Sequence, residues 1–217
     1  MNYNEIRRKT RAISVGNIKI GGDAPISIQS MTNTPSEDYA ATYAQMKALE
    51  AVGCDIVRMT VPNIEAAQVL GRLKESDIAM PIVADIHFDY RLAIAAADAG
   101  ADKIRINPGN IGDRDRVKAV VSKCREKRIP IRIGVNSGSL ERELLAKYGA
   151  PTAKALAESA MGHIKILESL DFFDIAVSIK SSDVFTMVNA NKILASMCDY
   201  PLHLGVTEAG RGEAGCI

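Results

Sequence analysis

Polar side chains recur at alternate positions near the ends of the predicted strands, where they could bind a charged ligand. The set comprises Gln29, Arg58, Thr60, Asp85, His87, Arg105, Asn107, Arg132, Asn136, Ser178, Lys180, His203 and Thr207, with Glu208 just past the last strand. In the strand predicted at 102–107, Lys103, Arg105 and Asn107 point to one side, because side chains alternate along a strand. Parallel strands are normally apolar on both faces, so this shared departure indicates a site.

The charges of this set predict the ligand. Four members are cations: Arg58, Arg105, Arg132 and Lys180. Buried cations without a partner are very costly, and Asp85 and Glu208 are the nearby carboxylates. A ligand with two or more negative charges is therefore expected. Arginine binds phosphate oxygens bidentately, and lysine adds a point charge.

Other members of the set have more than one interpretation. His87 and His203 fit either hydrogen-bonded core histidines or ligand donors and proton carriers. Asp85 fits a general base and a tether for an arginine equally well. Glu208 follows a strand end, which favours a role in the site. His163 lies on a helical stretch and is expected to be structural.

Strands and helices alternate along the chain. After a hairpin at 13–20, strands are predicted at 25–31, 54–60, 81–86, 102–107, 130–136, 174–180 and 202–207. Between them lie helical patterns, with Asp89 and Asp113 as helix caps and an interruption near 149–151. The face opposite the polar set is expected to pack under helices, and comprises Ile56, Ile104, Ile106, Ile131, Ile133, Val135, Ile175, Val177 and Ile179.

This alternation means an α/β fold with a parallel sheet. A (β/α)₈ barrel and an open doubly wound sheet both fit, and the barrel is favoured because no G-x-G-x-x-G follows the first strand. In a barrel, the polar strand ends converge on the mouth at which barrel active sites lie.

Composition narrows the class of protein. The chain has 217 residues, 47% of them hydrophobic, which predicts one globular domain spanning 1–217. The net charge of +1 gives no general attraction to nucleic acid or membrane, and the basic run at 7–11 is interpreted as a solvated segment. No segment approaches a membrane span of about 18 apolar residues. The four cysteines lack a C-x-x-C spacing, which indicates free thiols in a reducing cytoplasm and no metal site.

Seven long motifs along the chain carry a family resemblance: IQSMTNT, DIVRMTVP, VADIHFDYR, RINPGNIG, IRIGVNSGSLE, SDVF and PLHLGVTEAG. They resemble the N-terminal barrel of bacterial 4-hydroxy-3-methylbut-2-enyl diphosphate synthase. The resemblance implies reductive ring opening of 2-C-methyl-D-erythritol 2,4-cyclodiphosphate, with loss of a hydroxyl, in the non-mevalonate isoprenoid pathway. It also implies a four-iron, four-sulfur (4Fe-4S) cluster, flavodoxin or ferredoxin as electron donor, and a homodimer at full length.

The resemblance and the strand-end pattern together assign roles to the polar set. The substrate-binding residues would be Arg58, Arg105, Asn107, Arg132, Asn136, Ser178, Lys180 and His203. The catalytic residues would be Glu208, Asp85 and His87, with Glu208 as candidate proton donor and His87 adding a hydrogen bond.

One departure from the family pattern is large. The family holds its cluster in a C-terminal domain through three cysteines and a glutamate, and no such motif occurs in this chain. A complete barrel usually needs about 250 residues. We therefore expect a barrel that lacks its last strand–helix unit, and no reductive activity from this chain alone.

Two alternatives stay open. A dihydropteroate-synthase-like barrel would bind a pterin diphosphate at the same mouth, and SMTNTPSEDY is faintly similar to that family's first strand and loop. The chain could also be a diphosphate-binding module without catalytic activity.

Overall fold

Six parallel strands form one sheet in the computed structural model, which describes residues 7–205. In spatial order, which is also chain order, they are β3 (Gln29–Met31), β4 (Ile56–Thr60), β5 (Ile82–Asp85), β6 (Lys103–Ile106), β7 (Ile131–Asn136) and β8 (Ile175–Lys180). Strands laid down in consecutive order are typical of a TIM barrel and not of a doubly wound sheet, whose order reverses at a switch point. The predicted barrel-type fold is therefore confirmed.

Two strands differ from their predicted bounds by more than two residues. β3 begins at Gln29, whereas its strand was predicted from residue 25. The strand predicted at 202–207 is represented, within the described residues, by a single parallel bridge between Leu202 and Val177 of β8. Residues 206 and 207 lie outside the described part of the chain.

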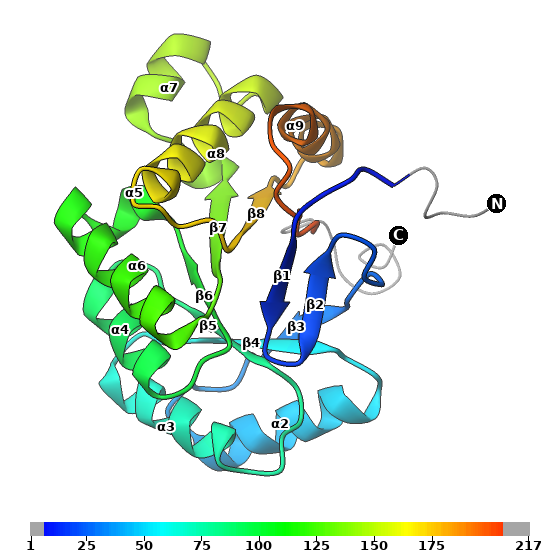
Figure 1. Ribbon diagram of the computed structural model, residues 1–217, viewed down its shortest axis with the longest axis vertical. Helices are drawn as coiled ribbons and strands as arrows, with labels where there is room; N and C mark the ends of the chain where they lie inside the picture. The colour runs from blue at the N-terminus through cyan, green and yellow to red at the C-terminus, as the bar shows by residue number, and fades with distance from the viewer. Residues whose placement is uncertain (1–6, 206–217) are drawn as a thin grey trace.

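The helices form an arc around the outer face of the sheet (Figure 1). They are α2 (Tyr39–Ala51), α3 (Ile64–Lys74), α4 (Tyr90–Asp98), α6 (Arg114–Lys127), α8 (Ala153–Glu168) and α9 (Val184–Met197). Three short elements lie in loops: α5 (Pro108–Ile111) after β6, and η1 (Ser137–Ser139) and α7 (Arg142–Tyr148) after β7. The predicted caps are confirmed, since the carboxylates of Asp89 and Asp113 accept from backbone amides in the first turns of α4 and α6. Among residues 7–205, no helix combines the length and apolar character that crossing a membrane requires.

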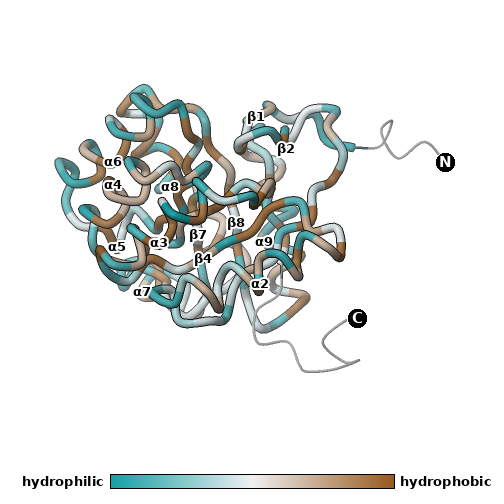
Figure 2. The backbone as a smooth tube through the Cα atoms, turned by 90° about the horizontal axis from the view of Figure 1, so that it is seen from below, coloured by the Kyte–Doolittle hydropathy of each residue, from teal (hydrophilic) through white to brown (hydrophobic). Residues whose placement is uncertain are grey.

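The core lies between the strands and the helices. Outward-facing side chains such as Ile104, Ile106 and Ile133 are fully buried there, and brown hydrophobic stretches run through the region of β7 and β8 in Figure 2. Ile56 was assigned to this face wrongly. It is two residues from Arg58, so the two share a face, and Ile56 packs in a separate inner cluster with Val15 and Val83.

An N-terminal hairpin supplies part of that inner cluster. β1 (Ala12–Val15) pairs antiparallel with β2 (Ile18–Gly21), as predicted. The turn begins at Gly16, whose φ of +55° suits glycine, and a Cβ there would lie 3.0 Å from Asp102 Oδ1. Asp102 immediately precedes β6, so the hairpin packs at the amino-terminal ends of the strands. The polar side chains gather at the opposite ends.

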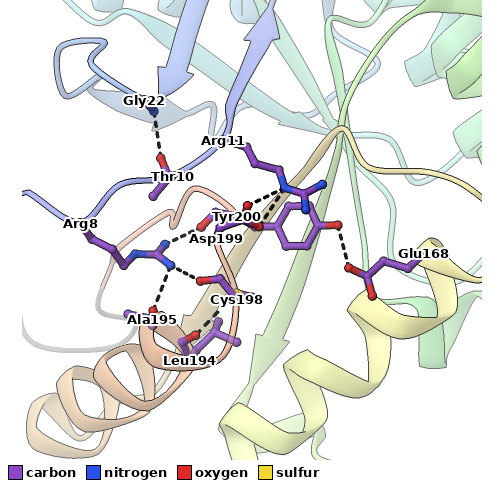
Figure 3. Close-up of polar contacts among 10 residues, drawn as sticks. All are labelled: Arg8, Thr10, Arg11, Gly22, Glu168, Leu194, Ala195, Cys198, Asp199 and Tyr200. Atoms are coloured by element: carbon purple, nitrogen blue, oxygen red, sulfur yellow. Dashed lines mark hydrogen bonds and ion pairs between the residues drawn. The ribbon is translucent and has the colours of Figure 1, made fainter.

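The basic run before the hairpin is solvated only in part: Lys9 and Arg11 are exposed, whereas Arg7 and Arg8 are half-buried. Arg11 Nε pairs with Asp199 Oδ1 at 2.8 Å, and its guanidinium lies 4.7 Å from the centre of the Tyr200 ring (Figure 3). Arg8 donates to three carbonyls at the end of α9 and just beyond it, those of Ala195, Cys198 and Tyr200 (Figure 3). Terminal helix carbonyls lack intrahelical partners, so these arginines fix the N-terminal segment to the end of α9.

Candidate functional site

Strand register aligns the charged side chains across the inner face of the sheet. Asp85 of β5 pairs with Arg105 of β6, and Arg105 pairs with Arg132 of β7. Four residues beyond Arg132 toward the mouth, Asn136 of β7 pairs with Lys180 of β8. Paired residues in a sheet point to the same face, so the register alone brings these side chains together.

A cavity of about 580 Å³ opens over these strand ends. Nine of the predicted site residues line it: Arg58, Asp85, His87, Arg105, Asn107, Arg132, Asn136, Ser178 and Lys180. Loop residues complete its wall, namely Phe88, Asn110, Ser137, Gly138, Ser139 and Ser182. His203 lines a neighbouring cavity, and Glu208 lies outside the described residues.

Asp85 sits between two of the arginines. Its carboxylate is almost fully buried and accepts a hydrogen bond from Arg105 Nη1 at 3.0 Å. Its second oxygen lies 3.5 Å from Arg58 Nε and 3.9 Å from His87 Nε2. Because both oxygens face guanidinium groups, this geometry fits a tether for the arginines better than a general base.

The absence of a side chain at Gly134 leaves room for the Arg105 guanidinium. A Cβ on Gly134 would lie 2.5 Å from Arg105 Nε and 2.8 Å from its Nη2. The guanidinium therefore packs directly on the backbone of β7, which only glycine permits. With its amide oxygen turned toward Arg105, Asn136 accepts a hydrogen bond from Nη2 at 3.2 Å.

Arg132 is a fully enclosed cation with incomplete hydrogen bonding. Its side chain is among the largest fully buried ones, and Nη1 donates to Ser178 Oγ at 2.6 Å. Within residues 7–205, its Nε and Nη2 have no hydrogen-bond partner, and neither does the Nε of Arg58 or Arg105. Burial, with the charges of Arg58 and Arg105, lowers the pKa of Arg132 to about 9. Such a group is stabilised by an anion that satisfies its free donors.

Two lysines near these arginines lose their protons more readily than ordinary lysines do. Burial, and then the charges of Arg58 and Arg132, lower the pKa of Lys180 to about 8. Burial lowers the pKa of Lys103 to about 7, and its amine donates to Gln29 Oε1 at 3.3 Å. The cation set inferred from the sequence omitted Lys103. Its position two residues before Arg105 was the signal that could have included it.

The candidate histidines differ in environment. His87 is exposed at the rim beside Phe88, so the interpretation as a core histidine was wrong for it. His203 is partly buried, and burial together with Arg132 and Lys103 lowers its pKa to about 2, which keeps the imidazole neutral. It lines the neighbouring cavity of about 570 Å³ with Lys103 and Gln29.

The described cysteines do not fit an iron–sulfur cluster. Cys54, Cys124 and Cys198 are free thiols. Cys124 is buried among apolar side chains, and burial raises the pKa of its thiol to about 12. A cluster requires several thiolates that converge, and in the part of the chain from 7 to 205 no three His, Cys, Asp or Glu side chains lie close enough to share a metal ion.

Comparison with known sequences identifies close relatives. The model of the GcpE TIM-barrel domain matches residues 10–217. This chain is 58% identical to 4-hydroxy-3-methylbut-2-en-1-yl diphosphate synthase (flavodoxin) of Fusobacterium nucleatum over 212 residues. The match spans 98% of this chain and 60% of that protein. The chain is 57% identical to the Pseudomonas aeruginosa protein of the same name, of which it covers 57%. The chain thus spans somewhat over half the length of these curated relatives.

Solved structures share the fold at low sequence identity. A phospho-2-dehydro-3-deoxyheptonate aldolase from Thermotoga maritima superposes with a TM-score of 0.63 at 14% identity, covering 92% of this chain and 56% of its own. A dihydropteroate synthase from Xanthomonas albilineans gives a TM-score of 0.55 at 14% identity, covering 89% of this chain and 76% of its own. At this identity, the likeness supports the barrel-type fold and carries no function.

Proposed function

Because the chain belongs to the GcpE TIM-barrel domain family, we propose that it forms the substrate barrel of a 4-hydroxy-3-methylbut-2-en-1-yl diphosphate synthase. The proposal rests on one structural observation, the enclosed Arg132 with unsatisfied donors at the wall of a cavity lined by three further cations. In the described residues, Asp85 is the one carboxylate that lines this cavity. A diphosphate supplies the missing negative charge and the acceptors.

The proposed reaction consumes 2-C-methyl-D-erythritol 2,4-cyclodiphosphate. Two electrons open the carbon–oxygen bond that closes the cyclic diphosphate, and the neighbouring hydroxyl leaves as water after protonation. The product is 4-hydroxy-3-methylbut-2-enyl diphosphate. Its diphosphate remains attached through the other ester oxygen, so the barrel holds the same group in substrate and product.

We assign the chain's own residues to binding and proton handling. Arg58, Arg105, Arg132 and Lys180 bind the diphosphate oxygens, with amide and hydroxyl hydrogen bonds from Asn107, Asn136 and Ser178. Asp85 holds Arg58 and Arg105 in place, and His87 contacts the ligand from the rim. Glu208, at the end of the seventh predicted strand, donates the proton to the leaving hydroxyl. His203, neutral and beside Lys103, completes the set of substrate contacts.

The redox part of the reaction comes from outside the described residues. In the proposed full-length enzyme, the electrons would be supplied by a four-iron, four-sulfur cluster held outside the described residues, with flavodoxin as donor. The printed names of both relatives include flavodoxin, which supports this partner. A homodimer and a cytoplasmic setting, where flavodoxin and reduced thiols are present, belong to the same proposal.

The competing functions make different demands on the cavity. A pterin-diphosphate barrel needs a slot for a flat heterocycle, whereas nine of the lining residues here are the charged and polar side chains predicted to bind a polyanion. A binding module without catalytic activity would need no proton donor. The 57–58% identity to named synthases favours the enzyme over both.

Turnover by the complete protein tests this proposal. Reduced flavodoxin and the cyclodiphosphate should yield 4-hydroxy-3-methylbut-2-enyl diphosphate, and Arg105→Met should abolish that activity. Binding of the cyclodiphosphate without any product would support the module instead. Preference for a pterin diphosphate over the cyclodiphosphate would support the dihydropteroate-type reaction.

A further inference from the structure

Two loops form one wall of the site cavity. The loop at 107–112 follows β6 and contributes Asn107 and Asn110 to the lining. The loop at 137–141 follows β7 and contributes Ser137, Gly138 and Ser139. Both must keep a fixed position if their polar groups are to meet a ligand held by the strand-end cations.

Both loops contact the same imidazole. His163 of α8 is almost fully buried, and its Nε2 lies 2.7 Å from Oε1 of Glu141, the last residue of the second loop. On the side of the first loop, a Cβ added to Gly109 would lie 3.0 Å from His163 Cε1, so the ring packs against the backbone of Gly109. Neither His163 nor Glu141 lines the cavity.

The Glu141 carboxylate has a second partner on α8 besides His163. Ser159 of α8 donates its hydroxyl to the same oxygen, Oε1, at 3.0 Å. Burial alone would raise the pKa of Glu141, but the adjacent His163 imidazole, the Glu141 backbone amide and the Ser159 hydroxyl bring it to about 2. The carboxylate is therefore ionised at every pH at which the enzyme would work.

Little else holds the middle of the second loop. Ser139 and Gly138 are exposed, and a Cβ on Gly138 would meet nothing within 4 Å. Ser139 Oγ reaches back to Asn136 O at 3.4 Å, a long hydrogen bond. The loop is thus anchored at its far end, by the buried Leu140 and by Glu141.

We propose that His163 and Glu141 are positioning residues for the diphosphate site, holding the loops at 107–112 and 137–141 against α8 in the geometry that binds ligand. The inference rests on the proposed function, since it concerns the wall of that same site. It assigns neither residue any contact with the substrate.

Glu158 of α8 provides a matched control. Glu158 accepts hydrogen bonds from Lys147 Nζ at 2.7 Å and from the Tyr148 hydroxyl at 2.6 Å. It therefore also ties α7 to α8, but at the far end of α7 and away from both loops. Glu158→Gln removes one charged tie between these helices, as Glu141→Gln does, without changing the contact to His163.

The test measures affinity and stability in parallel. Inorganic pyrophosphate is titrated calorimetrically into the full chain carrying Glu141→Gln, His163→Gln, both changes, or Glu158→Gln, and each Tm is recorded. Either single change at the pair should weaken binding by about tenfold, the lower end of what losing a supporting hydrogen-bond partner costs a metal site. The double variant should lose no more than a single one, because both act through one contact. Glu158→Gln should bind like the wild type even where its Tm falls as far.

Activity gives a readout that a purely structural role would not produce. In the complete protein, Glu141→Gln should raise KM with little change in kcat, since the pair touches no reacting atom. Wild-type affinity in both single variants, or a loss matched by Glu158→Gln, would overturn the positioning role, as would failure of both variants to fold. A wild-type protein that binds no pyrophosphate would overturn the anion site itself and the proposed function with it.

Discussion

Replacing Arg132 by methionine should stabilise the fold while weakening ligand binding. Burial and the neighbouring arginines lower the pKa of Arg132 from 12.5 to about 9. At about 1.36 kcal/mol for each pKa unit, that difference corresponds to an upper limit of about 5 kcal/mol for keeping the charge enclosed. The Arg132 guanidinium is fully protonated in the folded protein at pH 7, because that pH lies below its folded pKa. Apolar replacement of buried charges of similar volume typically gains about 1–4 kcal/mol, which is the expected increase in the free energy of unfolding.

The same substitution removes a cation from the lining of the cavity. A hydrogen bond from a charged donor contributes about 1.5–3 kcal/mol, so the dissociation constant for pyrophosphate should rise by about 10- to 150-fold. The two effects have opposite signs. A general loss of structure would instead lower both stability and affinity.

Urea unfolding and calorimetric titration measure the two quantities on one preparation. Arg72→Met is the matched control, because Arg72 is exposed on α3 with its guanidinium over the Tyr39 ring. It should change neither quantity by more than about 0.5 kcal/mol. If Arg132→Met binds pyrophosphate with wild-type affinity, or unfolds at clearly lower urea, the enclosed unpaired cation is not part of an anion site.

Three further changes have defined outcomes. Gly134→Ala should displace the Arg105 guanidinium and weaken pyrophosphate binding by about 1–2 kcal/mol. The control Gly162→Ala, whose added Cβ meets open space, should bind pyrophosphate normally. Equal affinities of the two variants would contradict the packing of Arg105 on Gly134. Burial lowers the pKa of Lys103 to about 7. Above pH 7 the amine is therefore mostly neutral in the folded protein but still protonated in the unfolded chain, so the free energy of unfolding should rise by about 2 kcal/mol from pH 7 to pH 9. Lys103→Met should remove that rise in urea unfolding at the two pH values, and an unchanged pH slope would refute it. Glu208→Gln should lower kcat far more than it raises KM in steady-state assays, and an effect on KM alone would refute its role as proton donor.

Local periodicity was enough to predict that the polar side chains at the strand ends gather in one place. Side chains alternate with a period of two, and consecutive parallel strands lie in aligned register, so polar residues at strand ends must share one face and one end. Arg105 beside Asp85 and Arg132 is the direct result. The helix caps at Asp89 and Asp113 were predictable for the same reason, because they depend on neighbouring residues alone.

Features that depend on distant contacts were missed. The contacts of Arg8 join residues 187 and 190 positions apart, and nothing near it in the sequence indicates them. The burial of Lys103 depends on distant segments that pack over the amino-terminal ends of the strands. The pairing of His163 with Glu141 joins a helix to a loop. Ile56 was a different failure, since the period of two already placed it on the face of Arg58.

Calorimetric titration of the complete protein with 2-C-methyl-D-erythritol 2,4-cyclodiphosphate tests most directly whether the strand-end cations form one diphosphate site. We expect one ligand per chain, an affinity that falls with rising salt as charge pairing requires, and loss of binding in both Arg105→Met and Arg132→Met. A pterin diphosphate should bind more weakly than the cyclodiphosphate. Undiminished binding in both variants, or no binding by the wild type, would contradict this account of the site.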